Sequence, residues 1–113
     1  MTLNYQGSAS LYERALRSIP SGVHSSTRAR QPHPLYFSRA EGGEVWDVDG
    51  NRHIDLIMGN GAVMLGHGNK EVQTAIEDLL RRGLSCGVEC DLAIEVAEMF
   101  LKIVPTADLV RFT

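Results

Sequence analysis

The sequence has 113 residues, of which 43% are hydrophobic and 22% charged, with a formal net charge of −3 at pH 7. This is the composition of an ordinary globular domain, and it argues against a disordered chain, a coiled coil or a nonspecific nucleic-acid binder. No apolar run approaches the roughly 20 residues that span a bilayer, and the polar N-terminus shows no secretory signal. We therefore expect a cytoplasmic protein that binds neither membranes nor nucleic acids.

Charge is distributed unevenly along the chain. Residues 1–40 carry five arginines and one acidic residue, whereas residues 41–113 carry thirteen acidic and six basic residues. The basic N-terminal region contains no lysine and no interleaved aromatic pattern of the nucleic-acid-binding kind. Single arginines that bind carboxylates explain this region better.

The first predicted helix covers about residues 10–19. Ser10 and Glu13 form a capping-box pattern, and apolar residues recur at helical spacing until Pro20-Ser21-Gly22 ends the helix. A polar loop over residues 22–34 follows. Loops of this length inside a small chain are usually functional or mobile.

Three short strands are predicted next, over residues 35–39, 44–48 and 52–57, as a β-meander. Asp49-Gly50-Asn51 is a hairpin signal, because Gly and Asn tolerate positive φ. The acidic residues from position 47 resemble the start of a calcium loop, but the glycine and the final glutamate of such a loop are not at the required positions. We interpret this run as a turn and predict no metal site.

A glycine-rich stretch, residues 59–68, matches neither a dinucleotide fingerprint nor a phosphate loop, because its third glycine comes at position 66 and His67 stands where the loop lysine should be. It indicates only that the backbone approaches something closely, either packed protein or a ligand.

Two amphipathic helices are predicted after this stretch, one between Asn69 and Gly83 and one from about Asp91 to Val104. We expect both apolar stripes in the core: Val72, Ala75, Ile76, Leu79 and Leu80 in the first, and Leu92, Val96, Met99, Phe100 and Ile103 in the second. Residues 108–113 then predict a strand that opens a parallel sheet. Because the loop and helix that normally follow such a strand are missing, we expect a fragment.

The residues alone point to no catalytic centre. Cys86 and Cys90 lack the partners of a zinc pattern, so we expect reduced thiols. Serine, cysteine and histidine side chains, Ser85 among them, are present without diagnostic spacing. A Schiff-base enzyme needs a desolvated lysine, whereas Lys70 and Lys102 occupy solvated helix positions.

The order of several motifs resembles that of a known family. Ile19-Pro20-Ser21-Gly22-Val23, then Ser25 and Arg28, then the run from Gly43 to Arg52, are similar to the N-terminal region of pyridoxal-phosphate class III aminotransferases, nearest to the glutamate-1-semialdehyde aminomutase branch. Leu65-Gly66-His67 and Leu109-Val110-Arg111-Phe112-Thr113 continue the similarity. It extends from about residue 10 to the end of the chain.

The resemblance implies an α/β fold, namely a fragment of a fold-type I pyridoxal-phosphate-dependent transferase. Its N-terminal segment would be α+β, with a small β-meander, and would lead into the first strand of the parallel sheet. Its expected domains are 1–68, which carries the helix, the substrate loop and the meander, and 69–113, which leads into a truncated cofactor domain. The phosphate-binding loop, the aspartate at the pyridine nitrogen and the Schiff-base lysine would all follow later in the parent enzyme. We therefore expect this 113-residue chain alone to be inactive.

The resemblance also implies substrate-binding residues. Arg28 matches an arginine that grips a substrate carboxylate, Ser25 matches a nearby hydroxyl, and Asn60 in the glycine-rich stretch is the third candidate. The alternative for Arg28 is an ion pair within the loop or at an interface. The implied cofactor is pyridoxal 5′-phosphate, and the implied partners are an amino acid or keto acid substrate, the rest of the parent enzyme and a second subunit of a homodimer.

Two departures from the aminomutase pattern leave the activity open. Gly59-Asn60-Gly61 stands where that branch carries Ser-Trp-Gly, and Cys86 stands where it carries an aromatic residue after Ser85. Loss of these aromatic side chains changes the volume and polarity of a pocket. The departures favour an aminotransferase with another amino acid substrate over the aminomutase itself, and a non-catalytic binding fragment is the third alternative.

Overall fold

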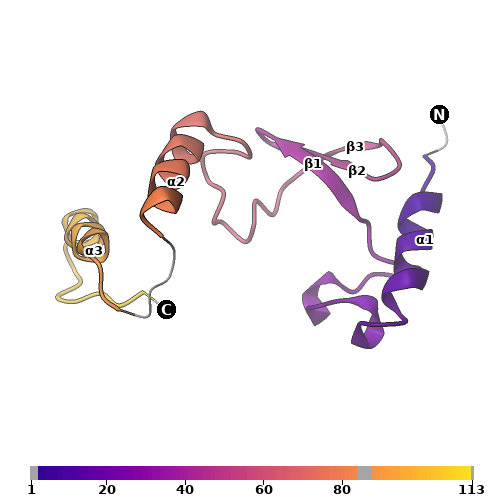
Figure 1. The fold of residues 1–113 in the computed structure, drawn as a ribbon, viewed down its shortest axis with the longest axis horizontal. Coiled ribbons are helices and arrows are strands. Elements are labelled where there is room, and N and C mark those ends of the chain that lie inside the picture. Colours follow the sequence, from indigo (N-terminus) through magenta and orange to yellow (C-terminus); the bar gives the residue numbers. More distant parts are fainter. Residues whose placement is uncertain (1–2, 84–87, 113) are drawn as a thin grey trace. The chain divides into compact units, whose positions relative to one another are not determined.

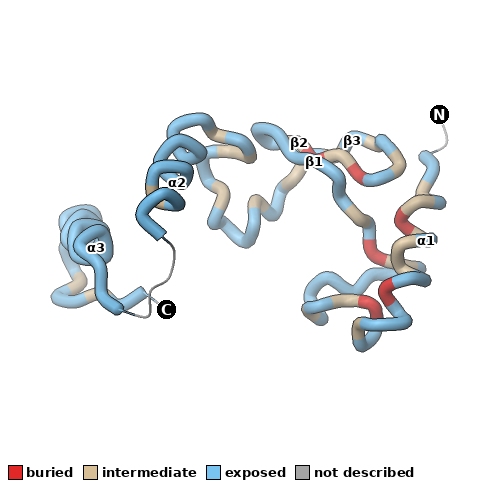
Figure 2. Tube along the Cα trace, viewed as in Figure 1, coloured by how far each residue is buried: buried red, intermediate tan, exposed pale blue. Residues whose placement is uncertain are grey.

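The structure is a computed structural model that describes residues 3–83 and 88–112 (Figure 1). The chain divides into two compact units, residues 1–76 and 77–113. In the part of the chain that is described, the buried residues all belong to the first unit (Figure 2); they are Ser8, Ala15, Gly22, Pro34, Val45 and Asp47. The division into domains 1–68 and 69–113 stays a prediction.

The predicted β-meander is confirmed. Strands β1 (Phe37–Glu41), β2 (Glu44–Asp47) and β3 (Arg52–Ile54) form an antiparallel sheet in the order β1-β2-β3. β1 begins two residues later than expected, because its pairing with β2 starts at Phe37 opposite Asp47 and runs to Glu41 opposite Glu44. Val45 in the central strand is 8% exposed and supplies the apolar centre of this sheet.

The turn between β2 and β3 is built around one buried carboxylate. The Asp47 side chain is almost fully buried and accepts hydrogen bonds from the backbone N–H of Asp49 (3.0 Å) and of Asn51 (2.8 Å), from Asn51 Nδ2 (2.8 Å) and from His53 Nε2 (2.9 Å). Burial alone would raise the pKa of Asp47, but the hydrogen bonds from His53, Asn51 and Asp49 outweigh it and hold the pKa below its ordinary value. The interpretation of this run as a turn is confirmed, since N–H donors occupy the carboxylate that a calcium ion would need.

The first helix, α1 (Gln6–Ala15), starts four residues earlier than the sequence predicts, so Ser10 lies inside it and caps nothing. Its first backbone N–H groups are satisfied from outside the helix. Asp49, in the hairpin turn, accepts from the backbone N–H of Gly7 at 2.6 Å and of Ser8 at 3.0 Å. A Cβ on Gly7 would lie only 2.9 Å from the Asp49 carboxylate, so a glycine is required for this close approach. The expected start was wrong because Asn4, which accepts from the Gln6 N–H at 3.1 Å, and the distant Asp49 together cap the helix four residues before Ser10.

We expect Asp49→Ala to destabilise α1 by about 1 kcal/mol, the usual cost of removing an N-terminal cap. Hydrogen exchange of the α1 amides in the full-length protein measures this loss as faster exchange. Asp49→Asn keeps one acceptor oxygen and is expected to lose less. Unchanged α1 exchange in Asp49→Ala would contradict the capping role.

The two later helices form where the sequence predicts them, α2 at Lys70–Arg82 and α3 at Asp91–Ile103. The Asn69 side chain caps α2 by accepting from the Val72 N–H at 3.1 Å, and Cys90 is the N-cap residue of α3. The expectation that their apolar stripes are buried was wrong: Ile76 is 49% and Ile103 73% exposed. An amphipathic stripe becomes core only when another element covers it, so these stripes are exposed apolar surface in the chain as described.

The strand expected at the C-terminus is not formed over residues 108–112, the part of it that the structure describes. A strand needs a neighbour to bond its backbone groups, and instead Phe112 packs edge-on against Phe100 of α3 at 6.1 Å between ring centroids. Ser85 and Cys86 lie outside the described residues. The thiol of Cys90 is free and exposed.

Candidate functional site

A groove of about 570 Å³ lies at the long loop between α1 and β1, and we call it the Arg28 groove. Residues from both arms of the loop line it, together with Ile57; the set is Ile19, Gly22, Val23, His24, Thr27, Arg28, Arg30, Pro34, Leu35, Tyr36, Phe37 and Ile57. Apolar side chains supply most of the lining, and the polar groups come chiefly from the tip of the loop. Such a combination is typical of small-molecule sites.

The groove is lined by two arginines and a histidine, Arg28, Arg30 and His24, and by no described acidic residue. Across residues 3–83 and 88–112, the Arg28 guanidinium takes part in no ion pair and no side-chain hydrogen bond. The sequence-based alternative, an ion pair within the loop, is therefore not what these residues form. The arrangement leaves a planar, permanently charged donor available to an anion.

A short 3-10 turn, Ser26–Arg28, presents this arginine. The backbone N–H of Arg28 donates to the Ser25 carbonyl at 2.9 Å. The hydroxyls of Ser25 and Thr27 lie 2.9 Å apart. Ser25 and Arg28, both predicted as substrate-binding residues, are thus brought together by the turn. Thr27 lines the groove, whereas Ser25 is not among the described lining residues and is connected to the groove through its contact with Thr27.

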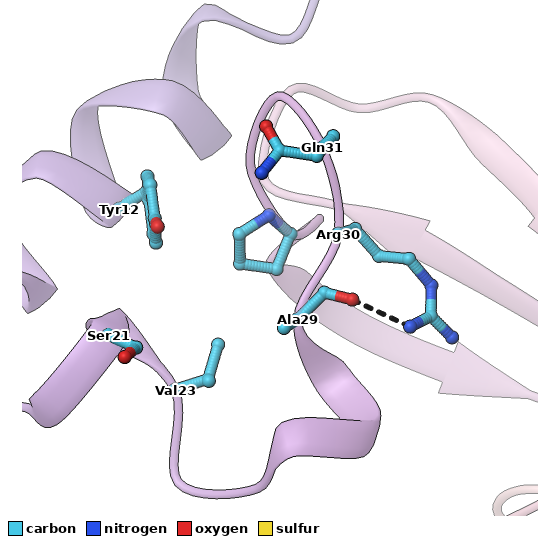
Figure 3. A pocket seen from close by; sticks show the side chains of 7 residues that line it. Tyr12, Ser21, Val23, Ala29, Arg30 and Gln31 are labelled. Atoms are coloured by element: carbon cyan, nitrogen blue, oxygen red, sulfur yellow. Dashed lines mark hydrogen bonds between the residues drawn. The ribbon is translucent and has the colours of Figure 1, made fainter.

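Arg30 differs from Arg28 because its guanidinium is engaged by its own loop. Nη1 of Arg30 donates to the carbonyls of Thr27 (3.0 Å) and Ala29 (2.7 Å), and Figure 3 shows the second bond. A second pocket of about 420 Å³ lies on this side of the loop; it is lined by Tyr12, Ser21, Val23, Ala29, Arg30, Gln31 and Pro34. Arg30 therefore shapes the loop, while Arg28 stays free to bind a ligand.

Asn60, the third predicted substrate-binding residue, lies on a different loop. It is exposed, has φ of +58°, and is not among the described lining residues of the Arg28 groove, although Ile57 from the same loop is. His67 Nε2 bonds the Asp55 carboxylate at 2.7 Å, and the backbones of His67 and Gly42 exchange two hydrogen bonds of 2.8 Å. These contacts fasten the loop that carries Asn60 to the β1–β2 turn.

The Asp55 carboxylate also accepts hydrogen bonds from the backbone N–H groups of Ile57 and Met58. The hydrogen bond from His67 is the main reason why the pKa of Asp55 lies below its ordinary value. The sequence offered no signal for this pairing, because twelve residues separate its members. It offered none for the Ser8 hydroxyl either, which acquires its role only when Tyr36 and the hairpin turn lie against α1.

Known proteins of one family are similar to this chain along nearly its whole length. The family model for class III aminotransferases matches residues 25–113. A curated relative from Methanothrix thermoacetophila, named glutamate-1-semialdehyde 2,1-aminomutase, is 43% identical over 111 residues, which are 98% of this chain and 26% of that protein. The chain therefore spans about a quarter of the length of the curated relatives it matches.

Solved structures agree with the fold. An omega-transaminase from Sphaerobacter thermophilus matches with a TM-score of 0.88 and 31% identity, over 94% of this chain and 24% of that one. A transaminase with PLP bound matches with a TM-score of 0.83 and 30% identity, over 89% and 24%. The expected fold class, a fragment of the mixed α/β fold of these enzymes, is confirmed.

Proposed function

Because the chain belongs to the class III aminotransferase family, we propose that it is the N-terminal part of a pyridoxal-phosphate-dependent aminotransferase that moves an amino group to or from an amino acid. The observation that carries this proposal is the Arg28 groove, whose described lining is mostly apolar and holds no acidic residue, and whose Arg28 guanidinium has no ion-pair partner in the part of the chain that the structure describes. Amino acids and keto acids share one anionic group, the carboxylate. A guanidinium fork bonds a carboxylate through two parallel N–H···O contacts.

Each predicted site residue has a stated role in this proposal. Arg28 binds the substrate carboxylate, and the Ser25 hydroxyl, oriented by Thr27 at 2.9 Å, hydrogen-bonds the substrate beside it. Asn60 contributes from the separate loop that Asp55 and His67 fasten. These residues bind and orient the substrate, and none of them is assigned a covalent or proton-transfer step.

The cofactor's covalent attachment is assigned to the rest of the enzyme. Pyridoxal phosphate supplies the carbonyl that forms a Schiff base and the ring that acts as an electron sink. The chain has two lysines, Lys70 and Lys102, and both are exposed, whereas a Schiff-base lysine is desolvated. The described residues do not fit this part of the chemistry, and we derive no step through the cofactor.

Glutamate-1-semialdehyde 2,1-aminomutase activity is the second candidate, because the curated relatives with that name are about 40% identical over nearly the whole chain. Gly59-Asn60-Gly61 and Cys86 favour the first candidate, since the aminomutase branch carries aromatic residues there. We also propose that the full-length protein is cytoplasmic and forms a homodimer. No helix among the described residues is long and apolar enough to cross a membrane.

Absorbance spectroscopy of the full-length protein tests the proposal. With pyridoxal phosphate bound, the Schiff-base band should disappear on addition of an amino acid donor and return on addition of a keto acid acceptor. Conversion of glutamate-1-semialdehyde without an added donor or acceptor would identify the aminomutase instead. If the full-length protein showed no Schiff-base band, the proposal would be wrong, and the third alternative, a non-catalytic binding protein, would be favoured.

For the isolated 113-residue chain, we expect no covalent trapping of pyridoxal phosphate by borohydride. The reason is that Lys70 and Lys102 are exposed, whereas the lysine of a Schiff-base enzyme is desolvated. Mass spectrometry after reduction checks this, with the full-length protein as the positive control. Cofactor reduced onto Lys70 or Lys102 would contradict the expectation.

A further inference from the structure

The hydroxyl of Ser8 joins two parts of the chain that are distant in sequence. Ser8 is fully buried in the first turns of α1, and its Oγ accepts a hydrogen bond from the backbone N–H of Tyr36 at 3.2 Å. Tyr36 is the last residue before β1. The Ser8–Tyr36 hydrogen bond therefore ties the helix that precedes the long loop to the residue at which the loop ends.

Both partners of this bond are themselves held by the hairpin turn. The Ser8 N–H donates to the Asp49 carboxylate at 3.0 Å, and the Tyr36 carbonyl accepts from the Val48 N–H at 2.8 Å. Removing the Ser8 hydroxyl leaves these two contacts in place. It takes away only the direct link between α1 and the far arm of the loop.

The Arg28 groove depends on the spacing of the two arms. Ile19 and Val23 line it from the arm that follows α1, Tyr36 and Phe37 line it from the arm that enters β1, and Arg28 stands at the turn between them. Without the Ser8 hydroxyl, the Tyr36 N–H loses its acceptor at a half-buried position, against the fully buried Ser8. An unsatisfied N–H of this kind is relieved when the segment moves to reach water.

We propose that Ser8 is a positioning residue that holds the two arms of the loop at the spacing at which Arg28 meets the substrate carboxylate. This inference rests on the proposed function, because it assigns Ser8 a role only through Arg28. It differs from a general stabilising role, since the cap of α1 by Asp49 does not need the Ser8 side chain.

Ser8→Ala in the full-length enzyme tests the proposal, with Ser10→Ala as the matched control on the same helix. Ser10 is exposed, and the same atoms are removed at both sites. We expect Ser8→Ala to raise KM for amino acid substrates about three- to tenfold, with kcat within about twofold, and to leave amines that lack the carboxylate unaffected. Amide exchange at Tyr36 should quicken. Ser10→Ala should change neither quantity.

A double-mutant cycle separates this proposal from the proposed function. Ser8→Ala in an Arg28→Ala background should raise KM no further, because Ser8 acts through Arg28. Faster Tyr36 exchange with unchanged KM, or an equal loss for both substrate classes, would overturn the positioning role. If Arg28→Ala slowed amino acids and amines equally, the role of Arg28 would be wrong, and the role of Ser8 that depends on it would be wrong as well. The exchange rate of the Tyr36 amide would then still show whether the Ser8 hydrogen bond forms. Should Ser8→Ala not fold, Ser8→Cys keeps a weak acceptor and should show the same changes at reduced size.

Discussion

Replacing Arg28 with alanine in the full-length enzyme is expected to lower kcat/KM for carboxylate-bearing amino acids by about ten- to a hundredfold. The guanidinium has no ion-pair partner among the described residues, so its loss breaks no ion pair there and removes the proposed contact with the substrate carboxylate. Cofactor binding should survive, since no cofactor contact is assigned to this loop. Steady-state kinetics on amino acids and on amines that lack the carboxylate measure the difference.

Two further variants sharpen this prediction. Arg28→Lys keeps the charge but cannot form the two-pronged contact, so it should restore only part of the lost kcat/KM. Arg17→Ala removes the same charge from an exposed position that does not line the groove, and it should change kcat/KM little. If Arg28→Ala slowed amino acids and amines equally, its effect would be structural and the carboxylate role would be wrong.

Replacing Asp47 with alanine is expected to destabilise the β-meander by about 3 kcal/mol. The Asp47 carboxylate is buried and accepts from two backbone N–H groups, from the Asn51 amide and from His53. Alanine would remove the acceptor of all four donors, of which Asn51 Nδ2 keeps a second bond to the Asn4 carbonyl, and a donor without an acceptor in a partly buried place is costly. Hydrogen exchange of the β2 and β3 amides in the full-length protein gives the free energy of opening.

Asp78→Ala is the matched control for this experiment. Asp78 forms an ion pair with Arg81 at 3.1 Å, but both side chains are largely exposed, so its removal should cost less than about 0.5 kcal/mol. Asp47→Asn keeps an acceptor oxygen of similar size and should fall between the two. A loss below about 1 kcal/mol in Asp47→Ala would show that the buried network contributes little to the stability of the meander.

The local elements were predictable because their signals are local. Asn69 and Gly83 bound α2 as their chemistry requires, and the Asn69 cap is present at 3.1 Å. The hairpin at Asp49-Gly50-Asn51 forms with Gly50 at φ of +84°, a conformation that glycine adopts without strain. The order of the motifs from Pro20 to Phe112 was specific enough to indicate the family.

Tertiary structure decided the rest, because several residues act through partners that are distant in the sequence. Asp49 accepts from the backbone N–H of Ser8 across 41 residues and so helps α1 to begin before Ser10, and a terminal strand without a neighbour does not form over residues 108–112. Local chemistry does not distinguish Arg28 from Arg30, yet in the folded loop Arg30 donates to the carbonyls of Thr27 and Ala29, whereas Arg28 has no ion-pair partner among the described residues. The amino-acid sequence was sufficient for the family, for the turn at Asp49-Gly50-Asn51 and for the Asn69 cap of α2, because each of these signals is local or lies in the order of the motifs. Which polar groups are buried, paired or left available follows from the packing of the loop, the helix and the hairpin, since a hydrogen bond across 28 or more residues leaves no mark in the local pattern.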